Sequence, residues 1–257
     1  MSGLYSQHLN RPWVRRLRNA LIALILLTLA AITLFPIYYM IVSSFGAPVE
    51  AGGASYSLFP STLTLDSYKF FFDFSPHSAR WLLNSLIVGV ITVLGNVLFA
   101  SLAGYAFAKI RFKGKRFLFF ALLCAMMIPY QVTQVPLYML MVNNLHMNNT
   151  YAALVAPTFV TAYNVFLCKQ FMGSLPTEII ECAKIEGCNQ LQIYWKIILP
   201  LSKTVLAVMA ILTFMKSWNE FFWPFLVTSK DYMQTIQVGL KNFKFANTTY
   251  FAPMMAG

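Results

Sequence analysis

The chain has 257 residues, of which 58% are hydrophobic and only 11% are charged. Soluble globular domains carry about 25% charged residues, so this composition excludes an ordinary soluble domain and favours a protein that lies in lipid. The formal net charge is +11, which in a soluble protein would point to nucleic acid. Here the charges occupy short segments between long apolar stretches, so we expect no nucleic-acid partner.

Five apolar stretches are each long enough to cross the hydrocarbon core of a bilayer, which needs about 20 helical residues. The predicted spans cover residues 19–44, 81–108, 117–142, 151–172 and 201–227. The first is too long for a signal-peptide core and should remain as a span. Pro129 and Pro136 predict an irregular helix in the third span. A polar run at 143–150 then predicts a turn at the membrane interface.

The distribution of charge predicts which side of the membrane each connecting segment faces. With the N-terminus inside, the inner segments hold 13 of the 19 basic and 3 of the 8 acidic residues, a net charge of +10. The outer segments hold the other 6 basic and 5 acidic residues, a net charge of +1. Because basic residues favour the cytoplasmic side, we predict an N-in topology.

We predict a cytoplasmic tail at residues 1–18, followed by a single transmembrane domain at 19–257 that contains all five spans. The long connections in this domain are an external segment at 46–80, a cytoplasmic loop at 173–200 and an external loop at 228–250. Residues 65–74 fit either a short interfacial helix or a loop packed on the span ends. The apolar stretch at 251–257 indicates the start of a sixth span, so we expect a C-terminally incomplete chain, with a native five-span protein as the alternative.

The cytoplasmic loop has the pattern of two short helices joined by a sharp turn. Thr177 is placed to cap the first helix, and the carboxylates of Glu178 and Glu181 favour the positive end of its dipole. Gly187 suits a left-handed C-terminal cap. Apolar residues then resume at helical spacing, and Pro200 marks the entry to the fifth span.

This loop resembles the EAA loop of ABC importer permeases, in which E-A-A, three residues, G, nine residues and I-x-L-P follow in order. The full spacing runs from Glu181 to Pro200, with Cys182 in place of the first Ala of the motif and Glu186 where Asp is usual. Further matches lie at Leu83–Leu86, Tyr105–Lys115, Trp218–Pro224, Thr235–Leu240 and Met255–Gly257. Together they resemble the maltose-type carbohydrate permeases, specifically the smaller six-span partner.

The resemblance implies an all-α polytopic helical bundle with the six-span permease fold, whose last span is missing from this chain. It implies import of a sugar or oligosaccharide across a bacterial inner membrane. The partners implied are a second permease subunit in a heterodimer, two ATPase subunits that carry ATP and Mg²⁺, a soluble sugar-binding protein and membrane lipid. This chain itself needs no cofactor, catalytic residue or metal, and Cys182 and Cys188 lack the nearby histidine that zinc sites often use.

The resemblance also assigns candidate sites. The residues expected to couple to the ATPase are Glu178, Glu181, Cys182, Ala183, Lys184, Glu186, Gly187 and Cys188; small side chains at 182 and 183 would let a partner approach. For Glu181, a solvated carboxylate at a helix start is the plainer alternative. Candidates for the substrate path are Asn84, Trp218, Asn219 and Glu220, and candidates for binding-protein contact are Lys230, Asp231 and Gln234.

Several alternatives stay open at this point. Lys216 and Glu220, four residues apart, fit an interfacial ion pair better than a pair lining the path. The aromatic side chains at 218–223 suit an aromatic belt as well as stacking on sugars. A secondary transporter would show inverted repeats, and an intramembrane enzyme would need a nucleophile and base or metal ligands in the spans. An importer permease for a solute other than a sugar is the nearest alternative.

Overall fold

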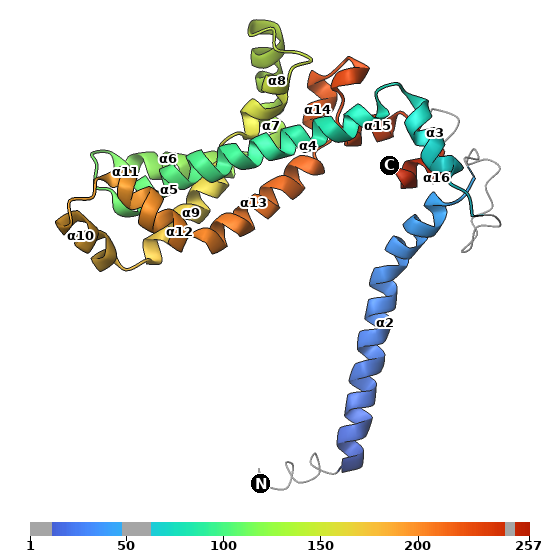
Figure 1. Cartoon of the computed structure of the whole chain (residues 1–257), viewed down its shortest axis with the longest axis horizontal. Helices are drawn as coiled ribbons and strands as arrows, with labels where there is room; N and C mark the ends of the chain where they lie inside the picture. Colours follow the sequence, from blue (N-terminus) through green and yellow to red (C-terminus); the bar gives the residue numbers. More distant parts are fainter. Residues whose placement is uncertain (1–11, 48–62, 245–249) are drawn as a thin grey trace. The chain divides into compact units, whose positions relative to one another are not determined.

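The computed structural model describes residues 12–47, 63–244 and 250–257, and the elements in these ranges are helices (Figure 1). The described chain divides into two compact units. One contains the described residues up to Ser75 together with Phe243–Gly257, and the other is Pro76–Asn242. The parts of the predicted tail and external segment at 1–11 and 48–62, and residues 245–249 of the external loop, lie outside the described residues.

The first unit contains α2 (Pro12–Ser44), α3 (Asp66–Phe74) and α16 (Phe251–Ala256). α2 has 33 residues, and its side chains are exposed along nearly the whole length, as suits a helix surrounded by lipid. It begins at Pro12, earlier than the predicted boundary at 19, because Pro is favoured in the first turn and the arginines that follow are good helix formers. Residues 12–18 are therefore the first turns of the span helix.

Of the two alternatives for residues 65–74, the structure shows the short helix, as α3. Its ring of Phe71 stacks on Phe243 with centroids 5.6 Å apart, and Phe74 lies 4.3 Å from the same ring. Phe71 and Phe243 are both buried. A hydrogen bond of 2.6 Å from Ser67 Oγ to the carbonyl of Gly46 ties α3 to the end of α2. Aromatic burial thus fixes α3 within its own unit.

The second unit holds the remaining elements. They are α4 (Ser78–Gly95), η1 (Asn96–Ala100), α5 (Ser101–Lys109), α6 (Lys115–Met127), α7 (Tyr130–Tyr138), η2 (Met139–Asn144), α8 (Tyr151–Val155), η3 (Ala156–Thr158), α9 (Ala162–Ser174), α10 (Thr177–Ile185), α11 (Gln190–Ile193), η4 (Tyr194–Ile198), α12 (Leu199–Leu201), α13 (Lys203–Trp218), α14 (Phe222–Val227), η5 (Asp231–Met233) and α15 (Ile236–Lys241).

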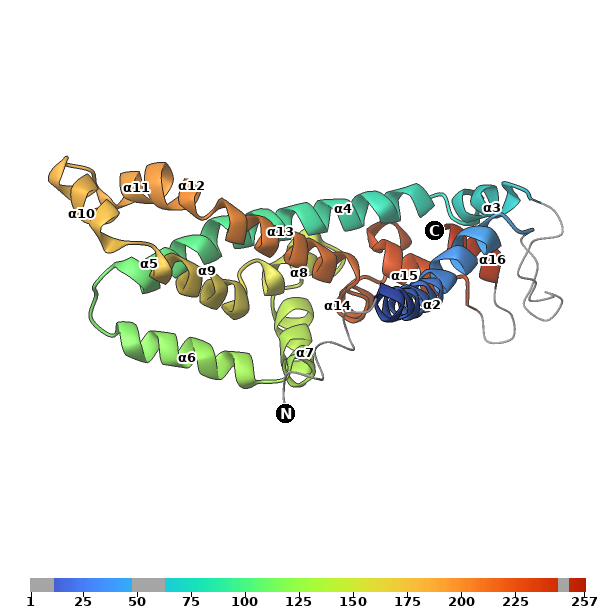
Figure 2. The same ribbon diagram turned by 90° about the horizontal axis from the view of Figure 1, so that it is seen from below.

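Two helices of the described chain, Pro12–Ser44 and Ser78–Lys109, are long and apolar enough to cross a membrane, and three bent pairs raise the number to five. The number agrees with the five predicted spans, but the fifth candidate runs from Gln190 to Trp218 and so begins inside the predicted cytoplasmic loop. The third is broken by 94° between α6 and α7 (Figure 2). The break lies at Ile128, whose backbone is extended because it precedes Pro129. The irregular helix predicted there is confirmed.

The fourth and fifth spans are also broken. α8 and η3 meet α9 at 44°, and the helical stretch Gln190–Leu201 meets α13 at 77°. The predicted fifth span at 201–227 does not continue as one helix, because α13 ends at Trp218 and α14 begins at Phe222. The turn predicted at 143–150 is present, with left-handed backbones at His146 and Asn149.

The second unit has two separate apolar cores. The first, which we call the loop core, contains Tyr105, Cys168, Met172, Ile180, Ala183, Ile193, Tyr194, Ile198 and Met209. The second, the distal core, contains Val88, Met141, Ala153, Leu154, Val155, Trp223, Val227 and Met233. α5 and α9 cross closely beside the loop core, where a Cβ on Gly104 would lie 2.4 Å from the Cβ of Cys168 and 3.0 Å from the backbone nitrogen of Lys169.

Candidate functional site: the coupling loop and the central cavity

The loop at 173–200, called the coupling loop from here on, is built around α10. Pro176 is the N-cap of α10, and no side chain caps this end. The expected cap by Thr177 is therefore wrong, because Thr177 already has its place inside the helix as the first residue. Glu178 lies in the first turn, where a carboxylate favours the helix dipole. Glu181 lies beyond that turn and is exposed.

The turn after α10 is a Schellman motif that needs Gly187. The N–H of Cys188 donates to the carbonyl of Ala183 at 2.9 Å, and the N–H of Gly187 donates to that of Lys184 at 3.0 Å. Gly187 has φ of 81°, and no other atom lies within 4 Å of where its Cβ would be. Asn189 then starts α11 with a capping box that it shares with Gln192. Every residue between the two helices thus has a defined role in the turn.

One face of the coupling loop packs against its own chain. Ile180 and Ala183 of α10 and Ile193 of α11 are buried in the loop core, together with Met172 of α9. The small side chain of Ala183 consequently allows close packing inside the chain, so the expected approach of a partner at this residue does not hold. Cys188 is half-buried against the same core, whereas Cys182 is exposed.

The opposite face of the coupling loop is exposed and mixes charge with large apolar side chains. The exposed fractions are 87% for Ile185, 63% for Leu191 and 49% for Trp195. The predicted coupling residues that are exposed are Glu178, Glu181, Cys182, Lys184, Glu186 and Gly187. Apolar side chains exposed together within a short segment are typical of a protein–protein contact surface. We call this face the docking face.

Hydrogen bonds fasten the coupling loop to α5. Tyr105 donates from its hydroxyl to Gln190 Oε1 at 2.8 Å, and the hydroxyls of Ser101 and Tyr194 are 2.6 Å apart. Lys109 at the end of α5 donates to the carbonyl of Leu175 at 2.5 Å, just after α9. The two ends of the loop are therefore tied to one helix, so that α5 and the loop must move together.

A buried polar layer separates the loop core from the distal core. Asn96 in η1 donates to the carbonyl of Thr158 at 2.8 Å and accepts from the backbone and side chain of Thr161. Asn164 donates to Asn96 Oδ1 at 2.9 Å and to Thr213 Oγ1 at 3.0 Å. This layer lies at the break in the fourth span and at the π-helical turn of the second span. Irregular helices leave backbone N–H and C=O groups without partners. The side chain of Asn96 bonds such groups at Thr158 and Thr161.

A cavity of about 160 Å³ lies beside this polar layer. We call it the central cavity. Its lining residues are Ser85, Val88, Thr92, Tyr130, Leu154, Thr158, Thr161, Tyr163, Asn164, Leu212, Thr213, Lys216, Ser217, Glu220, Trp223, Pro224 and Thr235. They come from α4, α7, α8, η3, α9, α13 and α14 and from the links before α9, α14 and α15, so the cavity is formed only when these helices pack.

Among the predicted path residues, only Glu220 lines the central cavity. Its Oε1 accepts hydrogen bonds from the backbone of Phe222 at 3.1 Å and Trp223 at 3.2 Å, at the start of α14. Glu220 therefore bonds the backbone at the start of α14, in place of the ion pair with Lys216 that we expected. Lys216 also lines the central cavity. Trp218 stacks on Phe214, and Asn219 is exposed and donates to its own helix.

Asn84 is a structural clamp and does not line the cavity. It is fully buried, and its Nδ2 donates to the carbonyls of Tyr232 at 3.0 Å and Gln234 at 2.8 Å. Its Oδ1 accepts from the hydroxyl of Tyr151 at 2.6 Å. Both amide hydrogens of Asn84 are taken by the backbone of a segment far along the chain. The structure thus gives Asn84 a structural role, and its assignment to the substrate path stays a prediction.

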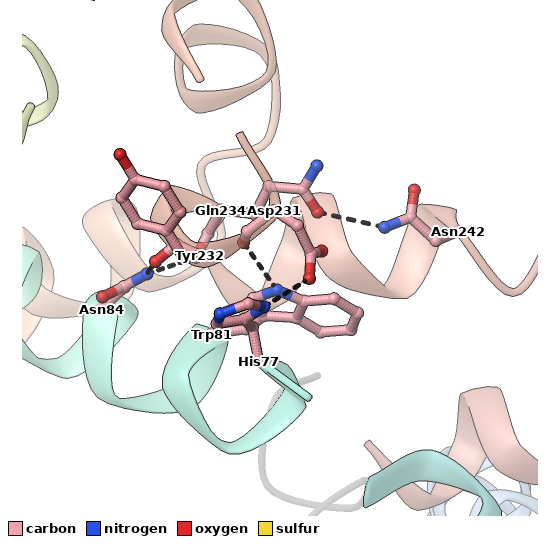
Figure 3. A network of polar contacts seen from close by, with 7 residues as sticks. All are labelled: His77, Trp81, Asn84, Asp231, Tyr232, Gln234 and Asn242. Carbon is pink, nitrogen blue, oxygen red and sulfur yellow. Dashed lines mark hydrogen bonds and ion pairs between the residues drawn. The ribbon is translucent and has the colours of Figure 1, made fainter. Parts of the chain in front are cut away.

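Residues 228–242 of the external loop are folded onto α4 (Figure 3). Asp231 bonds His77 through its carboxylate at 3.0 Å and accepts from the Trp81 indole through its carbonyl, also at 3.0 Å. Gln234 accepts from Asn242 at 3.0 Å. Much of the loop from Met233 to Val238 is buried, so this part of the external loop does not lie in water. Among its predicted contact residues, Lys230 is exposed.

Sequence reasoning missed Asn96, Asn164 and Thr213. Their signal was the polar amide or hydroxyl inside an apolar span, which costs free energy in hydrocarbon unless it finds a partner. The sequence did not reveal which partner each one has, because Asn96 and Asn164 meet across two different spans.

The helical spans and the two-helix loop between them define the class of an integral membrane transport subunit. Residues 96–257 match the family described as "Binding-protein-dependent transport system inner membrane component", which is more than half of the chain and includes the motif from Glu181 to Pro200. The chain belongs to this family. It is a permease subunit of an ABC importer and not an enzyme, and the alternatives of a secondary transporter and an intramembrane enzyme are set aside.

Two relatives named as transport-system permeases support this membership. The chain is 38% identical over 214 residues to the "Arabinooligosaccharides transport system permease protein AraQ" of Halalkalibacterium halodurans, covering 82% of this chain and 76% of the relative. It is 30% identical over 237 residues to the "sn-glycerol-3-phosphate transport system permease protein UgpE" of Escherichia coli K12, covering 90% and 83%.

A solved structure shares the fold. A chain of a bacterial ABC transporter involved in the import of the acidic polysaccharide alginate superposes with a TM-score of 0.80 at 22% identity, covering 94% of this chain and 89% of that one. The predicted permease fold is thereby confirmed.

Proposed function

We propose that this permease subunit imports a sugar or short oligosaccharide that a soluble binding protein delivers. The name of one relative supports this substrate class, since that permease belongs to a transport system for arabinooligosaccharides. Another relative belongs to a system for sn-glycerol 3-phosphate, a phosphorylated polyol, which is the nearest competing class. The many hydroxyl and amide side chains around the central cavity suit a polyhydroxylated solute. An importer for a solute of another class is the competing assignment.

The observation that carries the coupling part of the proposal is the docking face. Ile185 and Leu191 are among the more exposed large apolar side chains of the second unit, yet the turn between their helices is fixed by a Schellman motif and a capping box. A rigid apolar corner ringed by charge is suited to a cleft on another protein. We assign that cleft to the ATPase subunit.

Movement of the ATPase pair on binding ATP then pulls the coupling loop as a rigid body. The loop is tied to α5 by Tyr105 and Tyr194, so its displacement is passed to the helices that surround the cavity. Access to the path changes from one side of the membrane to the other, in a two-state transition biased by the nucleotide.

The proposed assembly contains a second, different permease subunit and two ATPase subunits, which hold ATP and Mg²⁺ while this chain carries no cofactor. It lies in a bacterial inner membrane with the N-terminus inside, surrounded by lipid and without nucleic acid. On the outer side, Lys230 and the neighbouring surface of the external loop contact the binding protein, whereas Asp231 and Gln234 keep the loop folded through the network in Figure 3.

The test is reconstitution of the full complex in proteoliposomes, with measurement of substrate-stimulated ATP hydrolysis and uptake. Arabinotriose, sn-glycerol 3-phosphate and an amino acid serve as the solutes. The variant Glu181→Lys reverses one charge on the docking face, and Asp73→Lys makes the same change on exposed α3 as the matched control. We expect sugar uptake by the wild type and the control, and loss of ATPase copurification or stimulation for Glu181→Lys because like charges repel at an interface.

Two results would contradict the proposal. Uptake confined to the amino acid or to sn-glycerol 3-phosphate would assign a non-sugar substrate. Normal ATPase binding and stimulation in Glu181→Lys, together with a normal Ile185→Asp variant, would show that the docking face is not the contact.

Charge reversal at Lys230 tests the outer contact. A changed order of sugar preference with unchanged docking of the binding protein would place selectivity in the external loop instead.

A further inference from the structure

The turn between α5 and α6 carries basic side chains that no acidic side chain balances. It spans residues 110–117 and lies at the same end of the second unit as the coupling loop (Figure 2). Its basic residues are Arg111, Lys113, Lys115 and Arg116. The sequence contains no Asp or Glu between Asp73 and Glu178, and neither ion pair of the described chain includes a residue of this turn. We call it the basic turn.

Contacts within the chain fix the shape of the basic turn. Lys115 donates from Nζ to the carbonyl of Ile110 at 3.0 Å, just after the end of α5. Gly114 has φ of 82° and provides the left-handed backbone from which α6 starts. The ring of Phe112 packs on that of Phe107, with centroids 5.8 Å apart. Lys115 is thus used inside the turn, which leaves the other three basic side chains for a ligand.

A hollow of about 520 Å³ opens on the basic turn. The residues that line it are Arg111, Phe112, Gly114, Lys115, Arg116 and Phe117. Arg111 and Arg116 are exposed, so a ligand can reach their guanidinium groups, and they make no hydrogen bond or ion pair within the described chain. Guanidinium groups bind phosphate oxygens through pairs of parallel hydrogen bonds. An engineered cavity of about 150 Å³ holds one benzene molecule, so the hollow has room for a phosphate with a glycerol attached.

Exposed apolar side chains continue from the hollow along α6. The exposed fraction is 74% for Phe117, 51% for Leu118 and 65% for Phe120, and α6 has no buried residue. α6 also forms the first part of the broken third span, so this face meets hydrocarbon. Two arginines at the membrane surface beside an apolar helix face match a molecule with an anionic head and apolar chains.

We propose that the basic turn binds the headgroup of an anionic phospholipid, with Arg111 and Arg116 on its phosphate and its acyl chains along Phe117 and Phe120. The predicted N-in topology places the turn on the cytoplasmic side, where anionic lipids attract basic segments next to a span. Lys109, just before the turn, donates to the carbonyl of Leu175, so the lipid holds the end of α5 to which the coupling loop is tied. This site does not depend on which solute is imported.

The test is competition binding to the purified importer complex, immobilised in a neutral detergent. Radiolabelled phosphatidylglycerol is the bound probe, and the competitors are unlabelled phosphatidylglycerol, phosphatidylcholine with the same chains, and inorganic phosphate. The arginine double variant is Arg111→Gln with Arg116→Gln. Lys196→Gln with Lys203→Gln is the matched control, because both lysines are exposed, lie on the predicted cytoplasmic side and carry the same charge.

We expect the arginine double variant to lose affinity for phosphatidylglycerol by about five-fold for each arginine, or about 25-fold in total. The lysine control should keep the wild-type affinity, and phosphatidylcholine and inorganic phosphate should compete poorly. Wild-type affinity in the arginine double variant would overturn the site. An equal loss in the lysine control would also overturn it, because the effect would then follow net charge alone. Displacement by phosphatidylcholine or inorganic phosphate as effective as by phosphatidylglycerol would show that no anionic lipid is recognised.

Discussion

Replacement of Gly187 by valine tests whether the geometry of the coupling turn is needed for function. The glycine has φ of 81°, and a Cβ would meet no atom within 4 Å. The cost of the substitution therefore comes from the backbone alone, and it is about 1–2 kcal/mol for a residue with a side chain in the left-handed region. That free energy changes the population of the native turn by a factor of roughly 5–30.

The structure provides a matched control for this substitution. Gly114 has φ of 82° and equally open space around its Cβ, but it lies before α6 and outside the coupling loop. Gly114→Val should thus carry the same backbone cost without changing the docking face. Gly187→Asn is a second control, because asparagine tolerates the left-handed conformation better than other residues with side chains.

The assay is copurification of the ATPase subunit with the permease, together with substrate-stimulated ATP hydrolysis and thermal unfolding in detergent. We expect Gly187→Val to lose the ATPase or its stimulation, whereas Gly114→Val and Gly187→Asn keep most of both. Normal coupling in Gly187→Val would refute the reasoning. So would an equal loss in Gly187→Val and Gly114→Val, because it would show a general effect of folding rather than of the turn.

Three further experiments test the packing and the topology. Gly104→Ala should lower the free energy of unfolding by about 1–3 kcal/mol, because its Cβ would overlap α9. Gly173→Ala is the control and should leave the free energy of unfolding unchanged, because its Cβ would lie in open space. Thermal unfolding of the complex measures both variants. Asn84→Leu should leave two buried carbonyls unpaired at about 1–3 kcal/mol each, and faster amide hydrogen exchange in residues 230–240 would reveal it. For topology, a cysteine at Lys113 should be protected from an impermeant reagent added outside intact cells and one at Lys241 labelled; the reverse pattern would reject N-in.

The apolar spans were predictable from the sequence because each one is set by local composition. A bilayer needs about 20 apolar residues in a row, and this requirement is visible without knowledge of any neighbour. The break at Pro129 was predictable for a similar reason, since proline restricts the residue before it. The bend at Ser202 falls at the predicted entry to the fifth span, which Pro200 marks. The breaks before Ala162 in the fourth span and before Phe222 were not predicted.

The coupling turn was also largely fixed by local chemistry. Gly187 satisfies a Schellman motif formed by residues within six positions of one another, so spacing alone was sufficient to locate it. Spacing alone did not show which side chains of the loop are buried and which are exposed. Ala183 and Cys182 are neighbours of similar size, yet one is buried in the loop core and the other is exposed.

The sequence by itself determined that this chain is a helical membrane permease, where its spans lie and where its coupling turn falls. Only the tertiary structure decided that Asn84 clamps a distant segment, that Asn96 and Asn164 meet between two cores, and that a cavity opens beside them. The physical reason is that a buried polar side chain must find a partner, but its own sequence neighbourhood does not specify which one. That choice is made when helices far apart in the chain pack together.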